Sequence, residues 1–125
     1  MAPLGAVEWL DEERYFDAVT ALSGSGPAFV ARFIDAMAAG GASLGLPEAQ
    51  AARMALATVS GTAALLDANG EVPAAMARRV TSPNGTTQAG LDVLDEGGVF
   101  VTRVGDTLGA AARRSAELSR PAEAQ

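Results

Sequence analysis

The chain has 125 residues, which is enough for one compact domain. Its nine basic residues are all arginine, and it contains neither histidine nor cysteine. These absences exclude a histidine-based catalytic triad, a lysine Schiff base, a disulfide framework and a thiolate metal site. Any catalysis must therefore use hydroxyls, carboxylates, arginine, backbone amides or a bound cofactor.

The formal net charge of −6 argues against nucleic acid as a partner, because nucleic-acid binding needs clustered basic charge. The longest uncharged runs, residues 18–31 and 54–66, are shorter than the roughly 18–20 residues that span a bilayer. The first residues lack the basic and then apolar pattern of a signal peptide. We therefore expect a cytoplasmic protein without a nucleic-acid or membrane partner.

Residues 6–10 form a short β-leaning stretch that has no partner strand, as at the end of an element that pairs elsewhere. Helical signals begin with the acidic residues 11–13, whose charge suits the start of a helix. The run 23–27, Ser-Gly-Ser-Gly-Pro, predicts a tight turn between two helices. We expect Ser25 as the N-cap and Pro27 in the first turn of the second helix.

Two nearly apolar helices are predicted next, over 27–44 and from Pro47 through Leu66 to a C-cap stop at residues 67–70. A helix that is apolar almost all round belongs inside a protein. Both helices carry small residues that permit close approach of backbones: Ala36, Gly40, Gly41, Gly61 and Ala64. We expect a homo-oligomer in which these helices pack across a twofold axis, with a helical hairpin inside a monomer as the alternative.

The remaining pattern predicts three further helices over 72–80, 88–96 and 99–119, with a break at Gly97 and Gly98. The whole chain is predicted to be all-α, with a helical domain over 11–120 and a frayed tail over 121–125. The paired charges are interpreted as solvated surface: Glu12-Glu13, Arg78-Arg79, Arg113-Arg114, and Asp92 with Asp95 and Glu96.

The Ser23-to-Pro27 run contains a Gly-x-Gly but not the third glycine of a dinucleotide fingerprint, because position 29 is Phe. It also follows a predicted helix, whereas that fingerprint follows a strand. Its two glycines can still let another backbone or a flat ligand approach closely.

Residues 81–87, Thr-Ser-Pro-Asn-Gly-Thr-Thr, place four hydroxyls around a turn just ahead of a helix. Such a turn can point the backbone amides of Gly85, Thr86 and Thr87 into one concavity, where an anion such as a carboxylate can bind. The Asn84-Gly85 pair suits positive φ. A well-capped helix start without a ligand is the alternative.

Three segments together resemble pyrroline-5-carboxylate reductase. Residues 17–30, DAVTALSGSGPAFV, resemble the start of the C-terminal domain of that family. Residues 80–91, VTSPNGTTQAGL, resemble its signature and are followed by 93–98, VLDEGG. Residues 38–47, AAGGASLGLP, also match in order and spacing, so that the resemblance runs from about Leu4 to Arg120.

The resemblance implies a reductase that uses NADP or NAD to reduce the cyclic imine pyrroline-5-carboxylate to proline. It implies a helical domain whose helices interlock between two subunits, as a homodimer or a higher oligomer. It also implies that residues 1–10 are the remnant of an interdomain junction. The substrate carboxylate would bind at Ser82, Gly85, Thr86 and Thr87. Thr87 would be the catalytic residue, with its hydroxyl near the ring nitrogen. Ser23, Gly24, Ser25 and Gly26 would close over the nicotinamide of the cofactor.

The sequence departs from the family in two ways. Asn84 stands where the family usually has Gly, although Asn tolerates the left-handed region. The Rossmann domain that holds the cofactor in the family has no counterpart in these residues, so we expect no cofactor binding and no activity from this chain alone. Two alternatives are a non-enzymatic homodimerisation module of the same origin and the helical domain of another Rossmann-type dehydrogenase.

Overall fold

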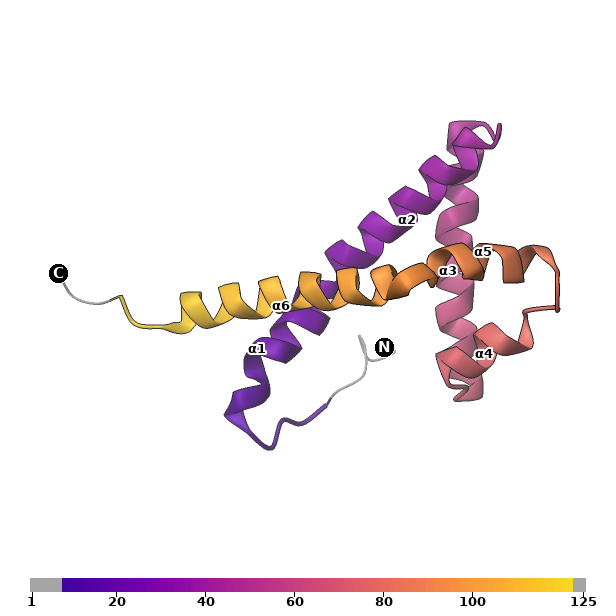
Figure 1. The fold of residues 1–125 in the computed structure, drawn as a ribbon. Coiled ribbons are helices and arrows are strands. Elements are labelled where there is room, and N and C mark those ends of the chain that lie inside the picture. Colours follow the sequence, from indigo (N-terminus) through magenta and orange to yellow (C-terminus); the bar gives the residue numbers. More distant parts are fainter. Residues whose placement is uncertain (1–7, 123–125) are drawn as a thin grey trace, which may run out of the picture. The chain divides into compact units, whose positions relative to one another are not determined.

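The structure, a computed structural model, describes residues 8–122. Every regular element within this range is helical, which confirms the predicted all-α class (Figure 1). The chain divides into two compact units. The larger comprises residues 28–102, and the smaller comprises the described residues before 28 and after 102.

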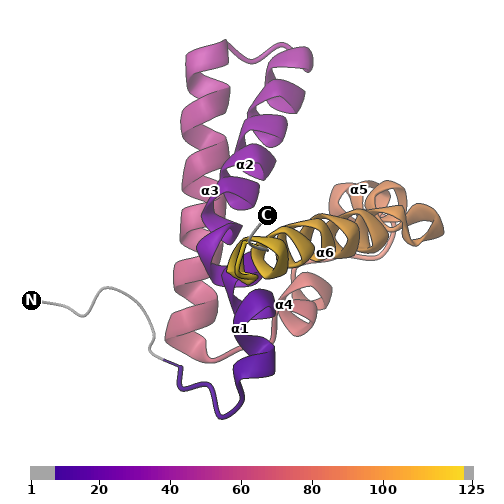
Figure 2. The same cartoon turned by 90° about the vertical axis from the view of Figure 1, so that its left-hand side faces the viewer.

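A helical hairpin forms the main part of the larger unit. It consists of α2 (Gly26–Ser43), which enters this unit at Ala28, and α3 (Glu48–Asn69). The two helices are joined by a short connection (Figure 2), and α2 runs away from it at an angle to α3 (Figure 1). Gly45 makes the reversal possible with φ of 102°, a value that side chains rarely allow. Both predicted apolar helices are therefore present, and α3 extends to Asn69 before the left-handed Gly70 ends it.

Small residues let the two helices of the hairpin approach closely. Ala51 and Ala55 on α3 are buried, with exposed fractions of 3% and 6%. A Cβ added to Gly41 on α2 would lie 3.4 Å from the Cβ of Ala51. Gly41, which we expected at a contact between subunits, thus packs within its own chain. Gly40 and Gly61 have no other group within 4 Å of an added Cβ, apart from their own helical backbone.

The rest of the larger unit follows the predicted order. It contains α4 (Pro73–Arg79), α5 (Thr86–Leu94), the short 3₁₀ turn η3 (Glu96–Gly98) and the start of α6 (Val99–Ser119). Gly97 and Gly98 both have positive φ, as expected at a break. Phe100 at the start of α6 contacts Phe33 of α2, with ring centroids 6.2 Å apart.

The smaller unit contains η1 (Glu13–Tyr15), α1 (Phe16–Val19), η2 (Thr20–Gly24) and α6 from Arg103 onward. Ala21 of η2 is 2% exposed. The Ser115 hydroxyl of α6 donates a hydrogen bond of 2.7 Å to the Asp17 carboxylate of α1. This bond joins residues that are 98 positions apart in the sequence and ties α6 to α1.

The turn predicted over residues 23–27 is wrong. The chain continues from α1 into α2 through η2, a π-helical turn in which the Ser25 N–H donates to the Thr20 carbonyl at 2.9 Å. Ser25 has helical φ and ψ, so it is not the extended N-cap that we expected. The physical reason lies in Pro27, which has no N–H to give to the Ser23 carbonyl; the helix widens by one residue without breaking.

The two ends of the chain are only partly described. Residues 6 and 7 of the β-leaning stretch lie outside the described residues, and Glu8 to Leu10 have no regular structure. Of the predicted frayed tail, residues 123–125 also lie outside them, and residues 121 and 122 have no regular structure.

Apolar side chains of the larger unit are left uncovered within the chain. Among the described residues, the only buried hydrophobic side chains are Ala21, Ala51 and Ala55. On α3, Met54, Leu56 and Leu65 are 51%, 56% and 42% exposed, and no charged residue occurs between positions 54 and 66. None of the described helices is long and apolar enough to cross a membrane. The packing of one chain therefore leaves apolar side chains exposed on opposite sides of α3, since Leu56 and Leu65 are nine residues, or about 180°, apart around the helix.

Replacing Ala51 with Val should destabilise the hairpin, because extra methyl groups have no room where α3 meets Gly41. We expect the free energy of unfolding to fall by about 1–3 kcal/mol. The matched control is Ala52→Val, in which the same residue is added at an exposed position and costs about 0.5 kcal/mol through helix propensity. Urea unfolding followed by circular dichroism measures both, and equal losses would contradict the close packing.

A charge placed at Leu56, an exposed apolar position of α3, should weaken self-association. We expect sedimentation velocity to show an assembly of at least two chains for the unaltered protein, and a shift toward the single chain for Leu56→Glu. Burial of an unpaired carboxylate at an interface costs several kcal/mol, which opposes assembly. Ser119→Glu, at an exposed position near the end of α6, adds the same charge as a control. A single chain at micromolar concentration before any substitution would refute the oligomer.

Candidate functional site

The segment Ser82–Gly85 forms a tight turn before α5. The Gly85 N–H donates a hydrogen bond of 3.0 Å to the Ser82 carbonyl. Asn84 has φ of 57°, and Pro83 precedes it, an arrangement typical of a type II turn. Positive φ is thus confirmed at Asn84, which takes the conformation that a Gly would adopt there.

Gly85 is required for a different reason from the one expected. Its φ is −90°, so it does not need the left-handed region. A Cβ at Gly85 would instead lie 3.2 Å from the Ser82 carbonyl oxygen and 3.4 Å from the Ser82 Cβ. The absence of a side chain therefore allows the turn to close on Ser82.

The amino end of α5 presents free backbone donors. Gly85 caps the helix without a side-chain hydrogen bond, and the first bond of the helix runs from Ala89 N–H to the Gly85 carbonyl at 3.2 Å. Within the part of the chain that the structure describes, the N–H groups of Thr86, Thr87 and Gln88 donate to no protein group. These donors and the positive end of the helix dipole favour an anion.

The set of free backbone N–H groups differs by one residue from the predicted set. We predicted amides of Gly85, Thr86 and Thr87, but the Gly85 N–H already donates to Ser82, and Gln88 supplies the third free donor. Ser82, Thr86 and Thr87 are exposed, and Gly85 is half-buried. All four residues assigned to the substrate lie in this one segment, and their roles stay predictions.

An ion pair fixes the helix that leads into the turn. Arg79 at the end of α4 donates to both carboxylate oxygens of Glu71, from Nε at 3.0 Å and from Nη2 at 2.8 Å. The Thr81 hydroxyl then donates to the Ala77 carbonyl at 2.5 Å. The hydrogen bond and charge of Arg79 hold the pKa of Glu71 below its ordinary value, against a smaller opposing effect of desolvation.

Sequence reasoning missed this ion pair. It treated Arg79 as part of a solvated basic pair and gave Glu71 no role. The available signal was the spacing of eight residues across a short helix, which puts Glu71, two residues before α4, beside the last turn of that helix.

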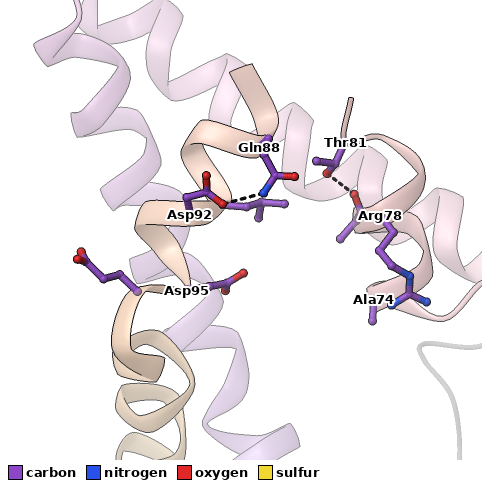
Figure 3. Close-up of a pocket in the computed structure, with 9 residues that line it drawn as sticks. Ala74, Arg78, Thr81, Gln88, Asp92 and Asp95 are labelled. Atoms are coloured by element: carbon purple, nitrogen blue, oxygen red, sulfur yellow. Dashed lines mark hydrogen bonds between the residues drawn. The ribbon is translucent and has the colours of Figure 1, made fainter. Parts of the chain in front are cut away.

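A surface pocket of about 670 Å³ lies between α4 and α5 and reaches the start of the turn at Thr81 (Figure 3). Arg78 extends from α4 on one side, and Gln88 and Asp92 from α5 lie on the other. The Gln88 amide donates to the Asp92 carboxylate at 2.7 Å. The lining residues are Ala74, Ala77, Arg78, Thr81, Gln88, Leu91, Asp92, Asp95 and Glu96.

Four charged residues of this pocket were interpreted from the sequence as solvated surface: Arg78, Asp92, Asp95 and Glu96. They are exposed, as expected, but they also line a pocket beside the turn. The missed signal was how close the pocket residues lie to the turn along the chain. Arg78 precedes Thr81 by three residues, and Gln88, another pocket residue, follows Thr87 directly.

The residues predicted to face a cofactor lie in the smaller unit. Ser23 and Gly24 end the π-helical turn η2 and are exposed, whereas Ser25 and Gly26 are half-buried. π-Helical turns are rare and occur often at functional sites. Among residues 8–122, no three or more acidic side chains are grouped so that they could hold a metal ion.

Comparison with known proteins shows the family of this chain. A family model described as pyrroline-5-carboxylate reductase dimerisation matches residues 13–118. The chain belongs to this family. The turn and the π-helical segment both fall inside the matched range, as the resemblance of residues 17–30 and 80–91 implied.

Two similar relatives are named pyrroline-5-carboxylate reductase. The one from Synechocystis is 50% identical over 108 residues, which cover 86% of this chain and 40% of the relative. The one from Pseudomonas aeruginosa is 44% identical over 119 residues, which cover 95% of this chain and 43% of the relative. The chain therefore spans about two fifths of the length of these curated relatives.

Solved structures agree with the fold. A pyrroline-5-carboxylate reductase from Coxiella burnetii matches with a TM-score of 0.89 and 32% identity, over 94% of this chain and 43% of that one. The pyrroline carboxylate reductase of Plasmodium falciparum, solved with NADP bound, matches with a TM-score of 0.81 and 28% identity, over 87% of this chain and 41% of that one.

Acidification should loosen α4 through Glu71. Its pKa is lowered in the folded chain, so its contribution to stability is complete above the ordinary carboxyl value of 4.5 and is lost as the pH falls through the lowered pKa. Hydrogen exchange of the α4 amides should therefore rise below that range. Glu71→Gln should remove this pH dependence, whereas Glu48→Gln, at an exposed position on α3, should leave it. An unchanged profile in Glu71→Gln would contradict the role of the ion pair.

Proposed function

We propose that this chain is the oligomerisation and substrate-binding part of a pyrroline-5-carboxylate reductase, which reduces a cyclic imine to proline. The observation that carries the proposal is the exposed Ser82–Thr87 turn with three free amides behind it, in a chain of this family. A carboxylate is the one ionised group that this substrate offers to such donors.

The free amides of Thr86, Thr87 and Gln88 bind and orient the substrate carboxylate, and the hydroxyl of Ser82 adds a donor from the turn. Thr87 offers a side-chain hydroxyl as well as its backbone N–H, and we assign this hydroxyl to a hydrogen bond with the ring nitrogen. A protonated imine is already electrophilic. The residues of this chain therefore need only to position the ring, which is the chief contribution of a site to hydride transfer.

NADP(H) or NAD(H), when bound, supplies the hydride. Among the described residues, the Ser23-to-Gly26 segment can contact one edge of such a cofactor but cannot enclose it. Gly24 is exposed and has no side chain, so that a flat ring can approach it. The segment has no third glycine and follows a helix, so it offers no cradle for the pyrophosphate. We therefore assign Ser23 to Gly26 to the nicotinamide end and expect no cofactor binding by this chain alone.

The proposal includes a homodimer or a higher assembly in the cytoplasm, with helices that interlock between subunits. The exposed apolar side chains of the uncharged part of α3 support the assembly, because free energy is gained when a second copy covers them. The alternative is a non-enzymatic module that associates in the same way. The non-enzymatic module differs from the reductase in one respect, because its function does not require carboxylate binding at the turn.

Carboxylate binding separates the two functions. We expect L-proline or a cyclic carboxylate analogue to shift the amide signals of Thr86, Thr87 and Gln88 in nuclear magnetic resonance spectra, and L-prolinamide to leave them unchanged. Ser82→Ala combined with Thr87→Val should weaken the affinity by about tenfold or more, because hydrogen bonds to a charged group contribute roughly 1.5–3 kcal/mol each.

The matched control is Thr107→Val, because the Thr107 hydroxyl donates only to the Arg103 carbonyl within α6. Its affinity for the carboxylate should equal that of the unaltered chain. Shifts confined to other residues, or equal shifts with L-prolinamide, would contradict carboxylate binding at the turn. Either result would favour the non-enzymatic module.

A further inference from the structure

Thr81 lies between the end of α4 and the Ser82–Gly85 turn, outside both helices. Its hydroxyl donates to the Ala77 carbonyl at 2.5 Å, at the edge of the pocket (Figure 3). This bond is half-buried and starts from a residue that follows a helix. Within residues 8–122, the other hydroxyls that donate to a backbone carbonyl lie inside helices and make exposed bonds: Ser43, Thr58, Thr107 and Ser119.

The Thr81 hydroxyl takes the place of a backbone donor that α4 lacks at its end. In a continuing helix, the Thr81 N–H would donate to the carbonyl four residues back, at Ala77. It donates instead to the Arg78 carbonyl at 3.2 Å, and the Val80 N–H donates to the Met76 carbonyl at 3.0 Å. In the described part of the chain, the hydroxyl is thus the one donor to the Ala77 carbonyl. A side chain that satisfies such a terminal carbonyl also ties the residue that carries it to the helix.

Ser82 is consequently held on both sides. Before it, the hydroxyl and the N–H of Thr81 bind two successive carbonyls of α4. After it, the Gly85 N–H donates to the Ser82 carbonyl at 3.0 Å. The support is itself fixed, because Arg79 in the last turn of α4 pairs with Glu71 before its first turn. The backbone that carries the Ser82 hydroxyl therefore has little freedom to rotate.

We propose that Thr81 is a positioning residue of the carboxylate site, which acts by fixing Ser82. The inference rests on the proposed function, in which the Ser82 hydroxyl and the free amides of α5 bind the substrate carboxylate. The helix fixes those amides, whereas Ser82 lies on an exposed turn. A donor that becomes ordered only when the ligand binds weakens the affinity, and a donor that is held beforehand does not. Thr81 therefore raises the affinity through Ser82, while its own hydroxyl donates to Ala77.

Helix capping alone makes a different prediction. The bond from Thr81 to Ala77 stabilises the end of α4 whether or not a ligand binds. If that were its whole effect, loss of the hydroxyl would lower the free energy of unfolding but would change neither the order of Ser82 nor the affinity for a carboxylate. These two quantities therefore separate a positioning role from a purely structural one.

Binding of L-proline to the full chain tests the affinity, with the Thr86 amide signal in nuclear magnetic resonance spectra as the measurement. Thr81→Val removes the hydroxyl and keeps the shape of the side chain. We expect it to bind about fivefold more weakly, which is equivalent to roughly 1 kcal/mol. Thr81→Ser restores the hydroxyl and should bind within about twofold of the unaltered chain. Thr107→Val loses a hydroxyl-to-carbonyl bond within α6 and should bind as the unaltered chain does.

A double substitution tests the route through Ser82. Ser82→Ala removes the hydroxyl that Thr81 is proposed to fix. In that background, Thr81→Val should weaken the affinity by less than about twofold more, because no hydroxyl is left to position. Losses that multiply as if the two residues were independent would contradict an effect of Thr81 through Ser82.

The order of Ser82 can be measured without a ligand. We expect the order parameter of the Ser82 N–H to fall from about 0.85, typical of a rigid backbone, toward about 0.6 in Thr81→Val, and to stay high in Thr81→Ser. Circular dichroism shows whether each variant is folded. If Thr81→Val loses helix, Thr81→Ala takes its place, because it also lacks the hydroxyl and adds no bulk. An unchanged order parameter in the folded variant would overturn the proposal.

The positioning role and the proposed function fail in different ways. Equal affinity for L-proline in the unaltered chain and in Thr81→Val would support the substrate role of the turn and would refute the positioning role of Thr81. Loss of Ser82 order in Thr81→Val, with recovery in Thr81→Ser but no binding of L-proline by the unaltered chain, would support the anchoring of Ser82. The same result would contradict the substrate role of the turn.

Discussion

The structure depends on the close approach of α2 and α3 at Gly41 and Ala51. Their separation is set by residues without bulk, so the hairpin closes tightly but encloses little apolar volume. The larger apolar side chains of α3, such as Leu56 and Leu65, then lie on its outside. A chain built in this way gains most of its hydrophobic stabilisation only when another surface covers those side chains. Membership of a dimerisation family agrees with this requirement.

The candidate site follows from a second constraint, the closure of the Ser82–Gly85 turn. Gly85 can lie against Ser82 because it lacks a Cβ, and Asn84 supplies the left-handed residue that reverses the chain. The helix α5 then starts without a side-chain cap, which leaves its first amides open. On the other side of the turn, the Glu71–Arg79 ion pair fixes α4. The donors are thus arranged by backbone geometry and by one exposed ion pair.

The sequence was sufficient for the order and extent of the helices, because their glycines, prolines and apolar spacings act locally. The last helix was predicted over 99–119 and occupies that range. Ser23 to Pro27 gave a wrong local structure, since a helix can absorb a missing N–H by forming a π-helical turn as well as by ending. The role of Gly41 also required the structure, because its contact with Ala51 depends on how two helices pack.

At the turn, the residue types predicted an anion site but could not show which backbone N–H groups are free to bind the anion. Whether the Gly85 N–H is free depends on the turn type, and that type is set by the conformation of Asn84. Arg78, Gln88 and Asp92 were missed for a related reason. They line one pocket only because α4 and α5 lie on its two sides, which cannot be read from the spacing of residues along a single helix.

The absence of histidine, lysine and cysteine gives the site a particular electrostatic character. Backbone amides and hydroxyls do not titrate in the physiological range, so carboxylate binding by this turn has no proton-linked group of its own. Among the described groups near it, Glu71 is the carboxyl with a displaced pKa, and its displacement is downward. Protonation of Glu71, which removes the ion pair that fixes α4, therefore requires a pH below the ordinary carboxyl value of 4.5.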